Sequence, residues 1–258
     1  MTELKNKPLV EAILEIRWSA NSKAADALTI VDDSYSLLLG RFFDRVRADY
    51  PFHEKLPTAD IPDHMTPHVA KHRFRVQLGD WPLLQIGPGL LTLNDTVGYT
   101  WADFSRRANL AVENLFKAHP EPERLQVSQA SLRYLDAIPL NLASSGLYEF
   151  LATNLKIKLE LPPELFSKNN VAQTPEEFLS LHSFRTSAPP GLLSLRIGLG
   201  ESNGVRAIIL DTSVSSTSQE APNTTTHFSS WVESAHAVLS EWFKVLTAGA
   251  LYESFEPV

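Results

Sequence analysis

The chain has 258 residues, of which 43% are hydrophobic and 21% are charged, values that are ordinary for a globular protein. It contains no cysteine, which excludes disulfide bonds, thiolate metal sites and cysteine nucleophiles. The net charge of −7 argues against nucleic-acid binding over the whole surface but leaves room for a local basic face.

The sequence also bounds where the protein works. No apolar stretch approaches the roughly 18–20 residues of a membrane-spanning helix, so we expect no membrane partner. The first eight residues lack the apolar segment of a signal peptide. Together with the absence of cysteine, this favours a cytoplasmic location.

The first quarter of the chain predicts a strand, a helix and a loop. Residues 9–18 alternate between two faces, which is typical of a strand. Apolar residues at helical spacing predict a helix over residues 34–50, which Pro51 ends. Residues 52–71 are rich in proline and show no sustained period, so we predict a loop.

Three strands and a helix complete the predicted first half. The strands are separated by glycine-containing turns and cover residues 73–78, 83–86 and 90–94. An amphipathic pattern then predicts a helix over residues 101–118.

The second half follows the same order of elements. We predict a long strand at 125–138, a helix at 145–155, a proline-containing loop at 162–174 and strands at 177–186, 192–199 and 205–211. A mobile loop rich in Ser and Thr at 212–226 and a closing helix at 227–251 complete the chain.

The two halves repeat each other in sequence as well as in element order. The sequence His-Arg-Phe-Arg at 72–75 is matched by His-Ser-Phe-Arg at 182–185. Apolar positions of the 101–118 helix recur in the closing helix at a constant offset, Phe104 matching Trp231 and Leu115 matching Trp242.

We therefore predict an α+β fold built from tandem pseudo-symmetric β-α-β-β-β-α repeats, residues 1–120 and 121–258. The repeats would form a curved antiparallel sheet with helices packed on one face, and the short joint between them favours one compact unit. In topology alone, this arrangement resembles the saddle of the TATA-binding protein family.

If helices cover one face of the sheet, strand alternation identifies the residues of the opposite, open face. This face is rich in arginine, with six arginines against two glutamates: Arg17, Arg73, Arg75, Arg133, Arg185 and Arg196, with Glu11 and Glu15. Such a surface favours a binding protein with a protein partner or an anionic ligand, and nucleic acid is an alternative partner. The competing interpretation is a solvated face on which Arg and Glu pair across strands.

The histidines offer a weak metal motif. His64, His68 and His72 are spaced by four, but Pro67 interrupts any helix that would align them. His182 matches His72 in the second half without the other two histidines, so we predict no metal site. We expect His236, inside the closing helix, to be a partly buried and hydrogen-bonded side chain.

The carboxylates suggest an alternative function. Glu11 and Glu15 share a strand face but lie about 13 Å apart at this spacing, which exceeds the roughly 5–9.5 Å of a glycosidase pair. Asp95 and Asp211 each end the last strand of a half, and Asp136 ends the strand that opens the second half. Turn formation or capping is the favoured interpretation for all three. The alternative is a metal-dependent enzyme that processes nucleic acid or phosphate esters, with Glu11, Glu15, Asp95 or Asp211 near the arginines.

No catalytic or cofactor motif of the sequence stands in the structural context that its chemistry requires. The glycines at 198–204 lack the spacing of a nucleotide-binding loop and lead into a strand rather than a helix. Residues 200–204 (Gly-Glu-Ser-Asn-Gly) match G-x-S-x-G by letter, but they lead into a strand rather than into the helix that follows a catalytic serine, and H-E-x-x-H is absent. We therefore predict no cofactor and name no catalytic residue.

Several stretches together resemble a known family. They are residues 7–17 (Lys-Pro-Leu-Val-Glu-Ala-Ile-Leu-Glu-Ile-Arg), 85–91, 99–101 (Tyr-Thr-Trp), 133–134 (Arg-Tyr) and 235–236 (Ala-His), with Phe243 and Thr247. Over nearly its whole length the chain resembles an uncharacterised, sporadically distributed family of bacterial proteins of about this size. The resemblance implies no catalytic residues, and the patchy distribution implies a defence or toxin–antitoxin setting.

Overall fold

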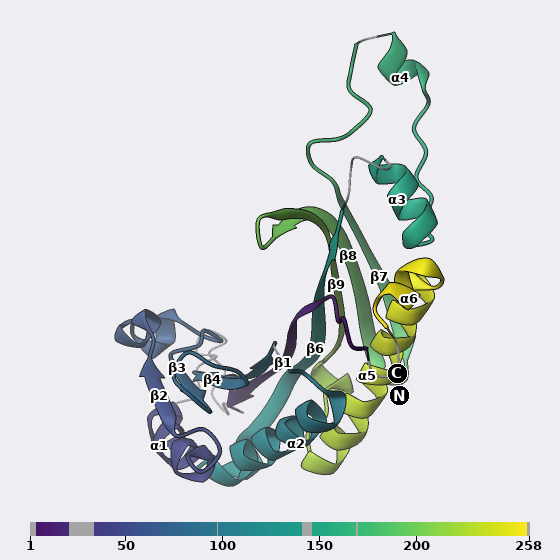
Figure 1. The fold of residues 1–258 in the computed structure, drawn as a ribbon. Helices are drawn as coiled ribbons and strands as arrows, with labels where there is room; N and C mark the ends of the chain where they lie inside the picture. The colour runs from purple at the N-terminus through teal and green to yellow at the C-terminus, as the bar shows by residue number, and fades with distance from the viewer. Residues whose placement is uncertain (1–3, 21–33, 97, 141–145, 169, 257–258) are drawn as a thin grey trace.

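The computed structural model describes residues 4–20, 34–96, 98–140, 146–168 and 170–256. Within these ranges, nine strands form one antiparallel sheet in the order β2-β3-β4-β5-β1-β6-β9-β8-β7 (Figure 1). The strands are β1 (Leu9–Ala20), β2 (Phe52–Lys55), β3 (His72–Arg75), β4 (Leu83–Gly87), β5 (Leu90–Asp95), β6 (Leu125–Pro139), β7 (Leu179–Ser187), β8 (Pro190–Ser202) and β9 (Val205–Thr217). The prediction of a large antiparallel sheet with helices is therefore confirmed.

The α-helices differ in length and in their relation to the sheet. They are α1 (Tyr35–Val46), α2 (Trp101–Ala118), α3 (Leu147–Asn154), α4 (Glu164–Ser167), α5 (Thr225–Thr247) and α6 (Ala250–Ser254). α1, α2 and α5 lie along the outer side of the curved sheet, whereas α3 and α4 belong to a long excursion beyond it (Figure 1). Among the described helices, none is long and apolar enough to cross a membrane.

Strands β1 and β6, the neighbouring strands that are farthest apart in the sequence, pair at the centre of the sheet. Leu14 of β1 lies opposite Leu132 of β6, and both side chains are fully buried. Alternation along β1 also buries Ile16 and Trp18 against the helices. The core under the helices is continuous from α1, where Phe42 packs 6.1 Å from Phe74, to α5.

One predicted loop is partly a strand. We predicted a loop over residues 52–71, but β2 pairs with β3 and forms one edge of the sheet. The 3₁₀ turns η1 (Pro57–Asp60) and η2 (Asp63–Met65) follow it. Lys71 is buried beneath them, and its ammonium group donates to the carbonyl of Ile61 at 2.5 Å and to Asp63.

A second predicted loop is also wrong in part. The Ser/Thr-rich segment at 212–226 begins as the last six residues of β9, paired with both β6 and β8. Val214 and Ser216 face the core, and Ser216 accepts a hydrogen bond from the indole of Trp231 at 2.8 Å. The 3₁₀ turn η4 (Ser218–Glu220) then leads toward α5.

The closing helix is broken rather than continuous. α5 ends at Thr247, and Gly249, at a φ of +98°, starts the short α6. The backbone just after α6 accepts hydrogen bonds from the N-terminal segment, from Asn6 N to Phe255 O at 3.0 Å and from Lys5 N to Glu256 O at 3.2 Å. These bonds hold the segment before β1 beside the end of the chain.

Candidate functional site: a cavity at the centre of the sheet

A cavity of about 380 Å³ lies where the segment before β1 meets β6, β9, α2 and α5. Its lining includes Leu4, Lys7, Pro8, Leu9, Tyr99, Trp101, Tyr134, Asp136, Thr212, His236, Leu239, Ser240 and Phe243. We call it the central cavity, because β1 is the middle strand of the sheet and β6 pairs with it. Residues from both halves of the chain therefore build one site.

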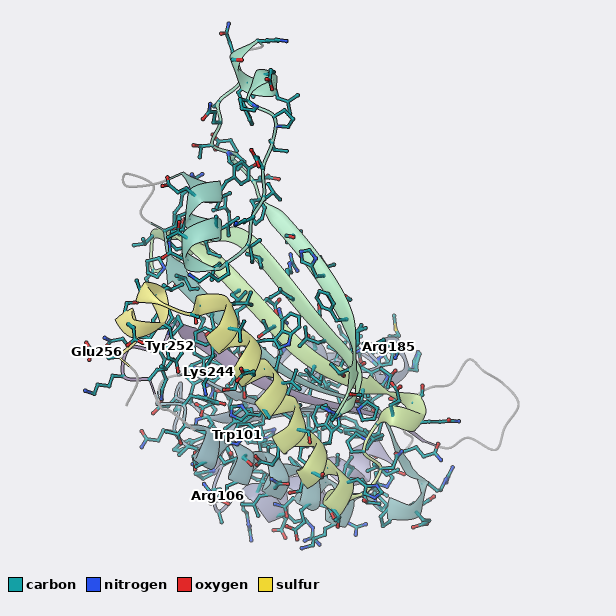
Figure 2. All side chains as sticks on the ribbon, turned by 90° about the vertical axis from the view of Figure 1, so that its right-hand side faces the viewer. Trp101, Arg106, Arg185, Lys244, Tyr252 and Glu256 are labelled. Atoms are coloured by element: carbon teal, nitrogen blue, oxygen red, sulfur yellow. The ribbon has the colours of Figure 1, made fainter. Side chains whose placement is uncertain are left out.

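Local structure directs the polar side chains toward the central cavity. Tyr134 and Asp136 stand two residues apart on β6, so both point to the helix side of the sheet. The hydroxyl of Thr100 caps α2 by accepting from the backbone N–H of Asp103 at 3.3 Å. This cap makes Trp101 the first residue of α2, and Figure 2 shows Trp101 beside α5.

A chain of hydrogen bonds crosses one wall of the cavity. The hydroxyl groups of Tyr99 and Tyr134 are 2.9 Å apart, and that of Tyr134 is 2.7 Å from Nδ1 of His236. The ring of Trp101 stacks on His236 at 3.6 Å between centroids, and its indole N–H donates to Glu233 at 3.1 Å. These contacts fix four aromatic side chains relative to one another.

Burial keeps the titratable groups of this series of hydrogen bonds uncharged at neutral pH. Desolvation lowers the pKa of His236 to about 4, so its imidazole is neutral. Desolvation also raises the pKa of Tyr99 and of Tyr134 above the ordinary tyrosine value. The three groups therefore act as neutral hydrogen-bonding partners.

Asp136 differs from the other polar residues of the cavity because it has no partner among the described residues. Only 5% of its surface is exposed, and no hydrogen-bond donor or cation pairs with its carboxyl group within the described part of the chain. Burial raises the pKa of Asp136 to about 7. Asp95 is similarly buried, but its Oδ1 accepts from the backbone N–H of Thr96 at 2.8 Å.

The lysine among the described lining residues of the cavity is already engaged. The ammonium group of Lys7 lines the central cavity and donates to the carbonyl oxygen of Tyr99 at 2.5 Å. It does not contribute to the pKa of Asp136, which burial alone perturbs. The unpaired carboxyl group is therefore the exceptional feature of the cavity.

The predicted arginines of the open face lie apart from the central cavity. On β3, Arg75 is 3.0 Å from Glu54, donates to the carbonyl of Asp80 at 2.6 Å and faces the Trp81 ring. Arg73 lies 3.4 Å from the same Glu54. The carboxylate of Glu54 thus forms ion pairs with both arginines.

The remaining arginines of this face are mostly paired as well. Arg17 Nε is 2.7 Å from Glu15, as an ion pair without hydrogen-bond alignment. Arg133 makes a bidentate contact with Asp211 at 2.7 and 2.6 Å. Arg185 is 78% exposed and lies 3.5 Å from Glu220.

Arg196 is the exception among the six predicted arginines. It is exposed, and the structure gives it no carboxylate partner among the described residues. It lines a groove of about 740 Å³ on the sheet face together with Arg133, Asp211, Leu179 and Ile209. This groove is the part of the predicted face that keeps an unpaired cation.

The carboxylates of the alternative enzyme hypothesis are each engaged by another group, although Glu11, Glu15 and Asp211 all lie near Arg133. Glu11 accepts from the side chain of Asn94 at 2.8 Å, Glu15 pairs with Arg17, and Asp211 pairs with Arg133. The described residues contain no group of three or more His, Asp or Glu side chains that could hold a metal ion. Of the three histidines considered as metal ligands (His64, His68 and His72), His72 has a ring nitrogen 2.8 Å from a ring nitrogen of His53.

Sequence reasoning missed the central cavity although its residues were visible. The alternation of β6 places a carboxylate, Asp136, in the buried series that includes Leu132, Tyr134 and Ile138. A carboxylate among these buried apolar positions was the sequence signal that could have indicated the cavity. His236 is buried and hydrogen-bonded as expected, and several residues that carry the family resemblance line the cavity.

Comparisons with known proteins add little. No family model matches the chain, and no curated protein sequence matches it. Among solved structures, Methanococcus jannaschii TBP is similar over 92% of this chain and 96% of that chain, with 11% sequence identity and a TM-score of 0.25. At that TM-score the similarity carries no argument about fold or function.

Proposed function

We propose that the chain is a binding protein that holds a small molecule in the central cavity. The observation that carries this proposal is the carboxyl group of Asp136, which is buried, lines the cavity and has no partner among the described residues. Burying an unpaired polar group destabilises a protein, so such a group is expected where a ligand completes it.

The size and chemistry of the cavity support this proposal. A volume of about 380 Å³ falls within the range of small-molecule sites. Its walls are mostly apolar, with contributions from Leu9, Leu239 and Phe243. A few polar groups among apolar walls are the usual composition of a ligand pocket.

The state of the polar groups favours binding over catalysis. The Nδ1 atom of His236 is occupied by the hydroxyl of Tyr134, and a pKa lowered to about 4 makes the imidazole a weak base. Tyrosines with raised pKa values are poor bases and nucleophiles at neutral pH. The wall of the cavity is suited to holding a ligand in place.

Fluorine-detected NMR screening of a small-fragment library tests the proposal. The comparison uses wild-type protein, Ser240→Leu, which fills the cavity, and Ser234→Leu, a matched change at another half-buried serine of α5 that does not line the cavity. We expect fragments that bind the wild type and Ser234→Leu but not Ser240→Leu. The proposal is wrong if no fragment binds, or if Ser240→Leu binds the same fragments equally well.

A second candidate function uses the sheet face. The exposed and unpaired Arg196, beside the ion pair of Arg133 and Asp211, supports binding of an anionic ligand or an acidic protein partner in the groove. Titration with a polyglutamate peptide tests it. Affinity should fall as salt rises and should be lost in Arg196→Glu, and a salt-independent complex would count against it.

We also propose that the two halves are structural repeats. The order β3-β4-β5-β1 in one half and β7-β8-β9-β6 in the other supports this interpretation, as do α2 and α5, which follow β5 and β9. The strand β2 has no counterpart in the second half of this scheme. In this proposal, the central cavity lies at the joint between the repeats.

A further inference from the structure

We infer that the ligand of the central cavity is a small amine, and that its ammonium group pairs with the carboxylate of Asp136. This inference rests on the proposed function and names the chemical class of the ligand.

The first step is the chemistry of the unpaired group. An ionised carboxylate can only accept hydrogen bonds, so its partner must be a donor. A carboxylate that is 95% buried also needs a compensating positive charge, because apolar surroundings do not solvate it. An ammonium group supplies both the charge and the donors.

The second step is that the residues described by the structure do not supply this partner. The hydroxyl groups of Tyr99 and Tyr134 are bonded to each other and to His236. Lys7 donates to the backbone carbonyl of Tyr99. Among the lining residues that the structure describes, the other titratable groups are therefore committed to partners, and none of them is the partner of Asp136.

The third step concerns the rest of the ligand. The side chains of Leu4, Pro8, Leu9, Leu239 and Phe243 form apolar walls that fit an alkyl or aryl body. An anionic ligand would meet the like charge of Asp136, which disfavours it. The chemical class that matches both the carboxylate of Asp136 and the apolar walls is an alkylamine or arylalkylamine.

Three isosteric probes separate charge from shape. Benzylamine, benzyl alcohol and benzoate have nearly the same size but present an ammonium, a hydroxyl and a carboxylate. Isothermal titration at pH 8 measures their affinity for the wild type, Asp136→Asn and Asp95→Asn. The last variant is the matched control, because Asp95 is buried but does not line the cavity.

We expect wild-type protein to bind benzylamine at least tenfold more tightly than benzyl alcohol, and benzoate not at all. Asp136→Asn should lose the tenfold preference, whereas Asp95→Asn should keep it, provided that circular dichroism shows both variants folded. If Asp136→Asn does not fold, Asp136→Glu replaces it, and a moved carboxylate should weaken the preference.

The outcomes separate this inference from the proposed function. Equal binding of amine and alcohol to wild-type protein, both abolished by Ser240→Leu, would leave the binding function intact and overturn the amine. Absence of benzylamine binding also overturns the amine, and the fragment screen then decides separately whether the cavity binds small molecules. A preference for the amine that survives in Asp136→Asn would assign it to another group.

Discussion

At the scale of single residues, Asp136 links stability to pH in an unusual direction. Its pKa is raised from the ordinary aspartate value to about 7 in the folded protein. Below about pH 4 the group is protonated in both states and contributes no difference. Between about pH 4 and 7 the unfolded chain releases this proton first, so stability falls as pH rises.

The first prediction concerns Asp136→Asn. Since the amide cannot ionise, the variant should match the wild type near pH 4 and exceed its unfolding free energy at pH 8 by up to roughly 4 kcal/mol. Urea denaturation at both pH values measures the difference. Asp211→Asn is the control, because Asp211 pairs with Arg133 and its loss should give no such gain. An equal effect of Asp136→Asn at both pH values would contradict the desolvation of this carboxyl group.

The second prediction concerns the centre of the hydrogen-bond chain. Tyr134→Phe removes the hydroxyl that joins Tyr99 to His236 and leaves two buried polar groups without it. We expect a loss of roughly 2–4 kcal/mol in unfolding free energy, measured by urea denaturation. Tyr252→Phe on α6 should change stability by much less, since that side chain is not fully buried. Similar values for the two variants would contradict the chain as a stabilising unit.

At the scale of elements, the length of the apolar pattern determined which helices and strands could be predicted from the sequence. The long strands β1 and β6 and the helices α2 and α5 carry several periods of apolar residues, and each lies close to its predicted position. The four residues of β2 and the polar end of β9 carry no such signal. Their strand structure depends on backbone hydrogen bonds to neighbouring strands, which side-chain patterns do not encode.

The third prediction compares two glycines in different elements. A Cβ atom added to Gly87, at the end of β4, would lie 1.8 Å from the carbonyl oxygen of Val69. Gly87→Ala should therefore lose roughly 1–3 kcal/mol of stability. Gly40 lies exposed within α1 with no atom near the added methyl group, so Gly40→Ala should gain about 0.5–1 kcal/mol. Thermal denaturation of both variants measures these opposite signs, and a neutral Gly87→Ala would contradict the close approach.

At the scale of the whole molecule, the candidate site could not be assembled from the sequence. The central cavity joins the segment before β1 to α2, β6, β9 and α5, which are distant along the chain. Alternation predicted an arginine-bearing sheet face, but the ion pairs of these arginines depend on neighbours such as Glu54 of β2 and Asp211 of β9. Cross-strand register, which the sequence does not reveal, determines these pairs.

The fourth prediction concerns cooperativity. β1 and β6 pair along the centre of the sheet, and one hydrophobic core extends beneath both halves. We expect a single unfolding transition, although chains of this length often unfold in steps. Tryptophan fluorescence and far-ultraviolet circular dichroism should give coincident urea transitions. Two separated transitions would contradict the proposal of one compact unit.

The central claim is that Asp136 is a desolvated carboxylate that binds a cationic ligand. Carbon-13 NMR of the Asp136 side-chain carboxyl group, titrated with pH and assigned with Asp136→Asn, tests this claim most directly. We predict a midpoint near pH 7, in keeping with the pKa of about 7, and a lower midpoint with benzylamine present, because a bound cation stabilises the ionised form. A midpoint near pH 4 that benzylamine does not change would contradict the claim.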